Sequence, residues 1–596
     1  MNNDLTLKAL ERIGLLRRVG GGSGDEYAFH HVLSQEAAYG SMLKSDRTAL
    51  HRNVAAVIEA LPDPSADTAA ALVFHYERSG DDARLFDCAT RAGDDARRRY
   101  ANREALDYFG RAIAAAGRLN NPALLPRIRA GFASRGSVFR NIGDPPNALR
   151  NFQEMAEYGA RVGDTATQIE ALNHINTIRV VTPGAGTEIG TNLDDDIQRA
   201  VALAETTGDT LLRARATWNS ALRLRFSDLE RATGRFEEAL AIALADPDPK
   251  RTEIRELIAM TAADIAVVEA VAGHFRQSRE RSRQAVEAAR ALDNGALLAD
   301  TLGDLGLNDF FAGDPASMRA HCEEGYAISK AAGNPWGLAY TGWPIIDALI
   351  DEGRYDRALA DITENNPRAH ESGFPIFIAF YQSMLNRLAC EMGDIDGACA
   401  TAFEAEARFL QMQAEGWTIA GLGMGACAAL RAGDTAAARA KLTLVWPPGK
   451  PPRLPFQAYR WVIGPVCELA LQSGTPAAAL PVLDWYITER EDSGARRLSA
   501  EGRYWRGRMR TQTGDLVGAA DDLAQARAGY EEIGARGLLW RLEAAQAQLS
   551  DAAGDGPGAD RARAAGRALV QTLSAEIADP GRRAGFLKNL AEFDHD

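Results

Sequence analysis

The sequence predicts an all-α protein: a right-handed α-solenoid of about eleven to thirteen helix pairs, with a small partial winged-helix segment at its N-terminus. Glycine recurs every 39 to 41 residues through the second half of the chain, and a small residue follows it at a fixed distance. Apolar residues recur at helical spacing between these glycines. One helix pair cannot bury its apolar face alone, so consecutive pairs must stack.

The recurrent glycines mark the turn between the two helices of each pair. Glycine ends a helix because it adopts the left-handed conformation without steric cost, and a following Asp can cap the next helix. Weaker glycine turns half an interval later are expected to end the second helix. The first set is Gly234, Gly273, Gly313, Gly353, Gly393, Gly433, Gly474, Gly514 and Gly554, and the second is Gly333, Gly373, Gly416, Gly494 and Gly534.

Small residues on both sides of each turn predict close contact between the paired helices. Seven positions before the turn stand Ala266, Gly306, Ala426, Cys467 and Gly507. Five positions after it stand Ala239, Ser278, Met318, Ala358, Ala398, Ala438, Ala479, Ala519 and Ala559.

The N-terminal residues follow a different pattern. Leu5–Leu15 is expected to form a helix, and residues 16–19 and 25–31 a hairpin around the glycine-rich tip at 20–24. Two helices, 32–43 and 46–61, are expected to follow, with His31 and His51 packed at the junction. We predict four segments: a partial winged-helix remnant with junction helices (1–62), irregular helical repeats (63–220), regular repeats of about forty residues (221–575) and a C-terminal tail (576–596).

The turn pattern Gly-x-aromatic-x-x-Ala, with a small residue seven before the Gly, resembles the tetratricopeptide repeat. The long interval is similar to the repeats in the sensor domain of maltose-regulator-type bacterial proteins. Tyr27–Tyr39, followed by Leu50 and His51, resembles the segment after the ATPase core of bacterial STAND-class proteins, either those fused to adenylate or guanylate cyclases or the large LuxR-type regulators. The resemblance implies a helical-repeat sensor that follows a P-loop ATPase and a winged helix.

The sequence offers no residue to which ATPase chemistry could be assigned. The P-loop pattern G-x-x-x-x-G-K-[ST] is absent, Gly449-Lys450 is followed by Pro451, and the glycines at 184, 186 and 190 have the wrong spacing for a dinucleotide site. The stretches 180–191 and 446–456 are therefore expected to be loops.

Composition and residue spacing argue against several other functions. The net charge of −14 disfavours non-specific binding to nucleic acid or anionic lipid. No apolar run is long enough for a membrane span, and the six cysteines form no C-x-x-C pair, so a cytoplasmic location with buried thiols is expected. The histidines lack zinc-site spacing. We expect no catalytic residue, cofactor or metal, although Asp194–Asp196 leaves an ion site as an alternative to simple helix-dipole stabilisation.

Because the sequence offers no catalytic, metal or cofactor residues, the surface of the helical repeats is the expected functional feature. We therefore predict a non-enzymatic interaction or sensor module that binds a protein, a peptide or a small inducer. Its partner-binding groove would lie on the concave face, and a STAND ATPase or cyclase in trans is one such partner; no nucleic acid and no membrane are expected. The groove residues expected on the first helices are Tyr340, Trp343, Phe380, Arg387, Trp461, Tyr504 and Arg508.

Alternatives stay open at this point. The seven groove residues could instead pack between helices, since Trp and Tyr fill such spaces well. The chain could be the C-terminal regulatory part of an ATP-dependent nucleotidyl cyclase or STAND regulator whose catalytic domains are absent from it. Arg17 and Arg18 in the hairpin could also contact DNA, although two arginines on half a domain make a poor groove reader.

Overall fold

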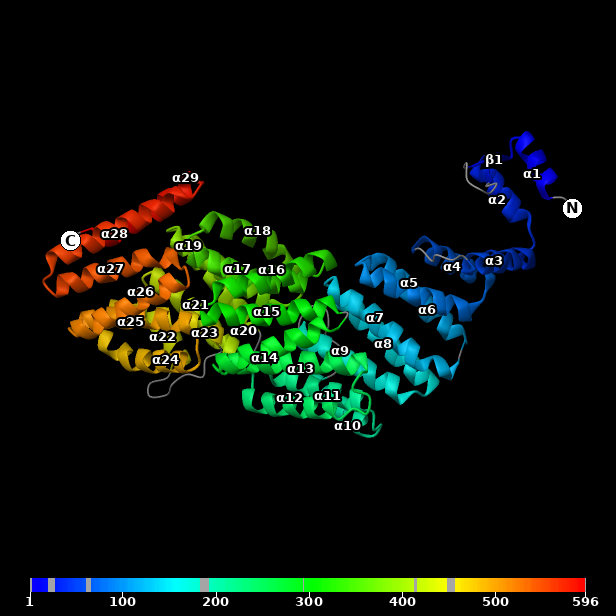
Figure 1. The fold of residues 1–596 in the computed structure, drawn as a ribbon. Coiled ribbons are helices and arrows are strands. Elements are labelled where there is room, and N and C mark those ends of the chain that lie inside the picture. The colour runs from blue at the N-terminus through cyan, green and yellow to red at the C-terminus, as the bar shows by residue number, and fades with distance from the viewer. Residues whose placement is uncertain are drawn as a thin grey trace. The chain divides into compact units, whose positions relative to one another are not determined.

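The computed structural model describes residues 3–19, 27–60, 66–119, 121–182, 192–292, 294–411, 415–446 and 456–594. These residues form 29 α-helices, three short 3₁₀ helices and one two-stranded sheet. The chain divides into two compact units, Met1–Val138 and Phe139–Asp596 (Figure 1). The expected hairpin tip at 20–24 and nearly all of the two expected loops lie outside the described residues; the four predicted segment boundaries stay a prediction.

The first unit opens with a helix and a hairpin. Its elements are α1 (Asn3–Arg12), β1 (Leu16–Arg18), β2 (Tyr27–Phe29), α2 (Val32–Ser41), α3 (Lys44–Glu59), α4 (Ala66–Ser79), α5 (Asp82–Arg98), α6 (Asn102–Leu119), η1 (Pro122–Leu124) and α7 (Leu125–Asn141), in which the boundary between the units falls.

The order of helix, hairpin and two helices agrees with the expectation from the sequence. The two strands run antiparallel, with Leu16 opposite Phe29. His51 is buried. Its Nε2 atom lies 2.8 Å from the hydroxyl oxygen of Tyr39, and its Nδ1 atom lies 2.8 Å from Nδ1 of His75. His31, in contrast, is exposed at the start of α2, so its predicted packing is wrong.

The second unit consists of helices alone within its described residues. They are α8 (Pro145–Val162), α9 (Thr165–Val181), α10 (Leu193–Glu205), α11 (Thr210–Leu224), α12 (Leu229–Leu244), α13 (Thr252–Val271), α14 (Phe275–Arg290), α15 (Gly295–Ala312), α16 (Pro315–Ala332), α17 (Pro335–Asp351), α18 (Tyr355–Glu371), α19 (Pro375–Glu391), α20 (Ile395–Gln411), α21 (Glu415–Arg431), α22 (Thr435–Val445), α23 (Phe456–Gln472), η2 (Pro476–Ala479), α24 (Leu480–Asp492), α25 (Arg496–Thr513), α26 (Leu516–Glu532), α27 (Arg536–Ala552), α28 (Gly556–Ala575), α29 (Pro580–Leu587) and η3 (Lys588–Phe593).

The predicted glycine turns are present in eight of nine cases. From Gly273 to Gly554 each has a positive φ, between +64° and +91°. Gly234 was predicted as the first of the series, and that is wrong because α12 runs through it. The chain turns earlier, where the carboxylate of Asp228 accepts a hydrogen bond from the Arg231 backbone N–H (3.1 Å) and caps α12. Gly416 likewise lies in the first turn of α21 instead of ending α20.

The small residues around the turns bring paired helices into contact, as the sequence predicts. All nine residues five positions after the predicted turns are at most 2% exposed. The Ser278 hydroxyl donates a hydrogen bond to the carbonyl of Ala266 (2.7 Å), which joins the two small positions directly. A Cβ at Gly507 would lie 2.8 Å from Cδ2 of Leu523, so only glycine fits there without a shift. The chain is thus an all-α helical-repeat solenoid.

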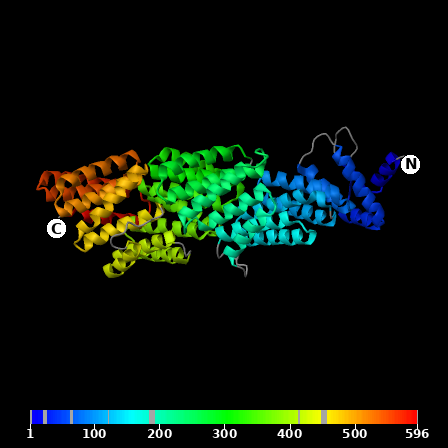
Figure 2. The same cartoon turned by 90° about the horizontal axis from the view of Figure 1, so that it is seen from below.

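Within the second unit, helix pairs that are distant in sequence contact one another (Figures 1 and 2). Arg496 donates to the carbonyl of Ala312 (2.9 Å), and Arg536 donates to the carbonyl of Glu352 (3.3 Å); each link joins residues 184 positions apart. Asn589 reaches the carbonyl of Glu391 (3.2 Å) in the same way. The turns of α15, α17 and α19 therefore rest on α25, α27 and η3, so that successive superhelical turns of the array contact one another.

Candidate functional site

A cavity of about 380 Å³ lies inside the second unit, walled mainly by the first helices of six consecutive pairs: α17, α19, α21, α23, α25 and α27. Each helix contributes one stripe. The residues six positions before the turn glycines are Asp347, Arg387, Cys427, Glu468, Arg508 and Gln548, and all six line the cavity. Among the residues ten positions before, Trp343, Ser383, Gly464, Tyr504 and Ala544 also line it. Residues four apart share one helix face, so the regular turn spacing aligns these side chains.

Five of the seven predicted groove residues line this cavity: Trp343, Arg387, Trp461, Tyr504 and Arg508. Phe380 lies behind the lining, with its ring stacked on Trp343 (centroids 4.5 Å apart) and 5.9 Å from Trp461. Tyr340 lies away from the cavity. Its hydroxyl donates to the Asp304 carboxylate, and its ring stacks on Phe377 at 5.5 Å.

One wall is fixed by a buried carboxylate that joins two superhelical turns. Asp351 at the end of α17 accepts hydrogen bonds from Arg497 of α25 at 2.6 and 2.8 Å and also pairs with Arg387 of α19. Arg387 contacts Asp347 as well, at 2.9 Å. Burial would raise the pKa of Asp351, but the guanidinium groups of Arg387 and Arg497 hold it below its ordinary value. Asp351 is therefore ionised, and its two arginines are paired.

The facing wall has a similar link. Arg541 of α27 forms an ion pair with Glu391 of α19 at 2.8 Å, and its guanidinium lies 4.6 Å from the ring centroid of Trp540. Both Trp540 and Glu391 also line the cavity, and Trp540 is almost completely buried. Charged side chains in the lining thus do two things: they form part of its surface and they tie α19 to α27.

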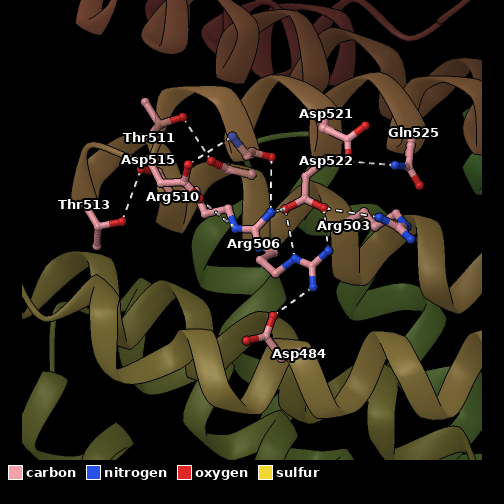
Figure 3. A network of polar contacts seen from close by, with 12 residues as sticks. Asp484, Arg503, Arg506, Arg510, Thr511, Thr513, Asp515, Asp521, Asp522 and Gln525 are labelled. Carbon is pink, nitrogen blue, oxygen red and sulfur yellow. Dashed lines mark hydrogen bonds and ion pairs between the residues drawn. The ribbon is translucent and has the colours of Figure 1, made fainter.

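A second network holds α25 in place from its other face (Figure 3). Asp522 of α26 is fully buried and accepts from Arg506 at 2.7 and 2.9 Å, from Arg510 at 2.9 Å and from Arg503 at 3.3 Å. A buried carboxylate is tolerated only with such partners. Because these arginines face α26, the opposite side of α25 is free to present Tyr504 and Arg508 to the cavity.

Four charged lining residues have no oppositely charged partner within 4 Å among the described residues: Arg431, Arg508, Glu468 and Glu592. Arg508 donates to the Tyr504 hydroxyl at 3.3 Å and lies 5.1 Å from the Trp505 ring centroid. Arg431 faces the thiols of Cys390 and Cys427. Burial raises the pKa of both thiols, that of Cys390 to about 12, so Arg431 meets neutral groups at pH 7.

The sequence prediction did not include Arg431, Cys427, Glu468 or Arg541. A signal for three of them was present: counting six residues back from Gly433 and Gly474 gives Cys427 and Glu468, and counting thirteen back from Gly554 gives Arg541. The predicted set came from the aromatic and arginine content of a few helices, whereas the turn count applies to every pair.

Other kinds of site are not evident in the described part of the chain. No three His, Cys, Asp or Glu side chains gather there as metal ligands would. None of the helices defined above combines the length and apolar character that crossing a lipid bilayer requires.

Comparison with known proteins returned no matching family model and no matching curated protein. Solved structures with similar folds include a Rap protein complexed with competence and sporulation factor (11% identity, 69% of this chain and 99% of that chain, TM-score 0.40). A Pyrococcus horikoshii STAND protein with a tetratricopeptide repeat sensor matches at 12% identity (74% and 58%, TM-score 0.33), and the human IFIT1 dimer with m7Gppp-AAAA at 13% (82% and 95%, TM-score 0.31). Because all three TM-scores are below 0.5, the fold assignment rests on the helix pairs of the chain itself.

Proposed function

We propose that this chain is an interaction and sensor module, without catalysis of its own, whose ligand binds in the cavity between α17 and α27. One observation carries the proposal: side chains from six consecutive pairs converge on one space of about 380 Å³. This volume lies within the range of small-molecule and short-peptide sites. The lining combines apolar rings such as Trp343 and Trp461 with charged groups such as Arg508, which is the mixture that gives a site both affinity and orientation.

A ligand at this position can change the conformation of the whole unit. The walls belong to successive superhelical turns, which are joined by ion pairs such as Arg497 to Asp351 and Arg541 to Glu391. A ligand that contacts both turns binds most tightly to one spacing between them and therefore shifts the population toward that spacing. This coupling is what a sensor requires, and signalling or transcriptional regulation is the process in which we place it.

The association with STAND-class ATPases or cyclases remains part of the proposal. Support comes from the segment that resembles their junction, in which a hairpin is followed by α2 and α3. Under this proposal the chain itself binds no nucleotide, since no phosphate loop is present in its sequence. Calorimetric titration with Mg·ATP tests this directly: no heat of binding is expected, and micromolar affinity would favour the alternative of a nucleotide-dependent regulator.

The binding proposal is tested by filling the cavity. Ala544 is buried in the lining, and Gln548 is exposed at its mouth, so Ala544→Trp and Gln548→Trp each place an indole there. Val517→Trp is the matched control, since Val517 is 85% exposed on α26 and does not line the cavity. Gln548→Trp disturbs no packed core, so it remains informative if Ala544→Trp destabilises the fold.

The assay is a thermal-shift screen of the full chain against a defined library of peptides of two to eight residues and small metabolites. A ligand at one hundred times its Kd adds about 2.7 kcal/mol of stability, which raises Tm measurably. We expect hits with the unchanged chain and with Val517→Trp, and loss of the same hits with both cavity variants. Hits that survive in both cavity variants, or a screen without hits, would overturn the proposal.

A further inference from the structure

We infer that the cavity takes a zwitterionic ligand with an apolar body: a short peptide of two or three residues whose amino and carboxyl ends are both free. The inference rests on the proposed function and specifies its ligand. It follows from four charged side chains in the lining that lack an oppositely charged contact, from the aromatic walls between them and from the limited volume.

The lining has as many carboxylates as arginines, and several of these charges are already paired with each other in the absence of a ligand. Within the lining, Arg387 is paired with Asp347, Arg497 with Glu501 and Arg541 with Glu391, and Asp351 behind the lining pairs with both Arg387 and Arg497. What remains is two guanidinium groups and two carboxylates: Arg431 and Arg508, and Glu468 and Glu592. Arg431, Arg508 and Glu468 are partly withdrawn from water, and such a charge costs free energy unless it is paired; Glu592 is exposed beside them. The unpaired set therefore favours a ligand that brings one charge of each sign.

The four groups are near one another without touching. Glu468 acts electrostatically on both Arg431 and Arg508, and Glu592 acts on Arg508, yet no nitrogen–oxygen distance between them falls within 4 Å. A simple anion would satisfy the arginines and leave both carboxylates unpaired, and a simple cation would do the reverse. A ligand with an ammonium at one end and a carboxylate at the other satisfies both pairs, and bidentate contact with a guanidinium favours the carboxylate at Arg431 or Arg508.

Aromatic side chains line the same cavity as the charged groups. Trp343, Trp461, Tyr504, Trp505 and Trp540 all line the cavity. Such rings contribute a large apolar contact area with little loss of side-chain freedom. An apolar side chain on the ligand would lie against them, which distinguishes this site from one built for a sugar phosphate or an inorganic anion.

The dimensions limit the length of the ligand. A cavity of about 380 Å³ lies near the lower end of the usual range for ligand sites, so it encloses a short peptide and not an extended one. Gln548 and Glu592 are the lining residues that are exposed to solvent, which places the opening between α27 and η3. A ligand carboxylate would then meet the arginines inside, and its ammonium would have Glu592 near the opening.

The probe for this inference is the tripeptide Ala-Phe-Ala in four forms: with free ends, acetylated, amidated and capped at both ends. Binding to the full chain is measured by isothermal titration calorimetry and by quenching of tryptophan fluorescence. We expect each cap to weaken binding at least tenfold and the doubly capped form not to bind measurably. Equal affinity for the free and doubly capped forms would overturn the inference.

Two variants assign the ends of the peptide. Arg508→Gln should abolish the preference for a free carboxylate and keep the preference for a free amine, whereas Glu592→Gln should do the opposite. Arg283→Gln and Glu280→Gln on the exposed face of α14 are matched controls and should change neither preference. Far-ultraviolet circular dichroism and Tm establish that each variant is folded before its affinities are compared.

The same experiment separates this inference from the proposed function. If Ala-Phe-Ala fails to bind while other library hits remain sensitive to Gln548→Trp, the zwitterionic ligand class is wrong and the binding module stands. If no hit is sensitive to Gln548→Trp, both are wrong.

Discussion

Substitution of Gly393 by alanine tests whether contact between superhelical turns stabilises the second unit. Gly393 has a φ of +66°, and a Cβ built there would lie 2.8 Å from the carbonyl oxygen of Gly585 in α29. Gly554 has a similar φ of +72°, but nothing lies within 4 Å of its Cβ position. The two glycines occupy the same place in their repeats and differ in whether another superhelical turn covers them.

The expected costs follow from that difference. A residue with a Cβ in the left-handed conformation costs about 1–2 kcal/mol relative to glycine, and both variants incur this cost. Overpacking against a rigid group adds about 1–3 kcal/mol, and only Gly393→Ala incurs it, because a backbone carbonyl cannot rotate away as a side chain can. Gly554→Ala should therefore lower the free energy of unfolding by about 1–2 kcal/mol and Gly393→Ala by about 2–5 kcal/mol.

Urea unfolding followed by circular dichroism gives both values, provided that the slope of the free energy of unfolding against urea concentration is the same for the two variants. Hydrogen exchange measured by mass spectrometry gives a local readout that does not depend on two-state unfolding. Exchange in residues 576–594 should become faster in Gly393→Ala and stay unchanged in Gly554→Ala. Equal destabilisation by the two substitutions, with unchanged exchange in that segment, would refute the claim that stacked superhelical turns support each other.

Three further predictions concern charged and thiol groups. Arg497→Met leaves Asp351 buried with one partner fewer and should lower the free energy of unfolding by about 3–5 kcal/mol, against less than about 0.5 kcal/mol for the exposed control Arg283→Met, both measured by urea unfolding. Burial raises the pKa of Asp300 to about 7, so the folded state binds its proton more tightly than the unfolded state; this contribution is complete below about pH 4 and is lost as the pH rises through 7. Stability should fall over that range by at most about 4 kcal/mol, and Asp300→Asn should flatten the profile in thermal unfolding from pH 4 to 8. Cys390, whose pKa is raised to about 12, should react with iodoacetamide at pH 8 far more slowly in the native chain than after unfolding, as read by peptide mass spectrometry; equal rates would contradict its burial.

The helix pairs could be predicted because each is specified by neighbouring residues. A turn glycine and its two small residues lie within about a dozen residues of one another, and an Asp often follows the glycine, as at Gly507, Gly514, Asp515 and Ala519, so their signal is local. Gly234 shows the limit of that signal. Asp228 provides an earlier cap and Gly234 tolerates a helical conformation, so a glycine in the correct register is not sufficient to end a helix.

The contacts between helix pairs that are distant in sequence could not be predicted in the same way. Arg496 and Ala312 are 184 residues apart, and nothing in either local sequence indicates the other. The separation that brings them together is set by the small rotation from each pair to the next, which accumulates over several repeats. The groove prediction could not include these contacts for this reason, and five of its residues lie around the cavity.

Five of the seven predicted groove residues line the cavity, and the other two lie outside it for separate reasons. Phe380 and Tyr340 occupy the position thirteen before their turn glycines, as does Trp461. Only Trp461 of these three lines the cavity, because Phe380 is covered by its neighbours and Tyr340 is drawn to Asp304. Position along a helix gives the face on which a side chain lies, whereas its depth depends on what the adjacent repeats place in front of it.

The 184-residue links also restrict how this protein can change its length during evolution. An open repeat array tolerates the gain or loss of a unit, since each unit contacts only its immediate neighbours. Here, duplication of one unit between Glu352 and Arg496 would move both arginines out of phase with their carbonyls, so that Arg496 would no longer reach Ala312 and Arg536 would no longer reach Glu352. Descendants of this chain should therefore gain or lose whole units at α22–α24 far less often than they gain residues in the turns at Gly433 and Gly554, where no atom lies within 4 Å of a Cβ position.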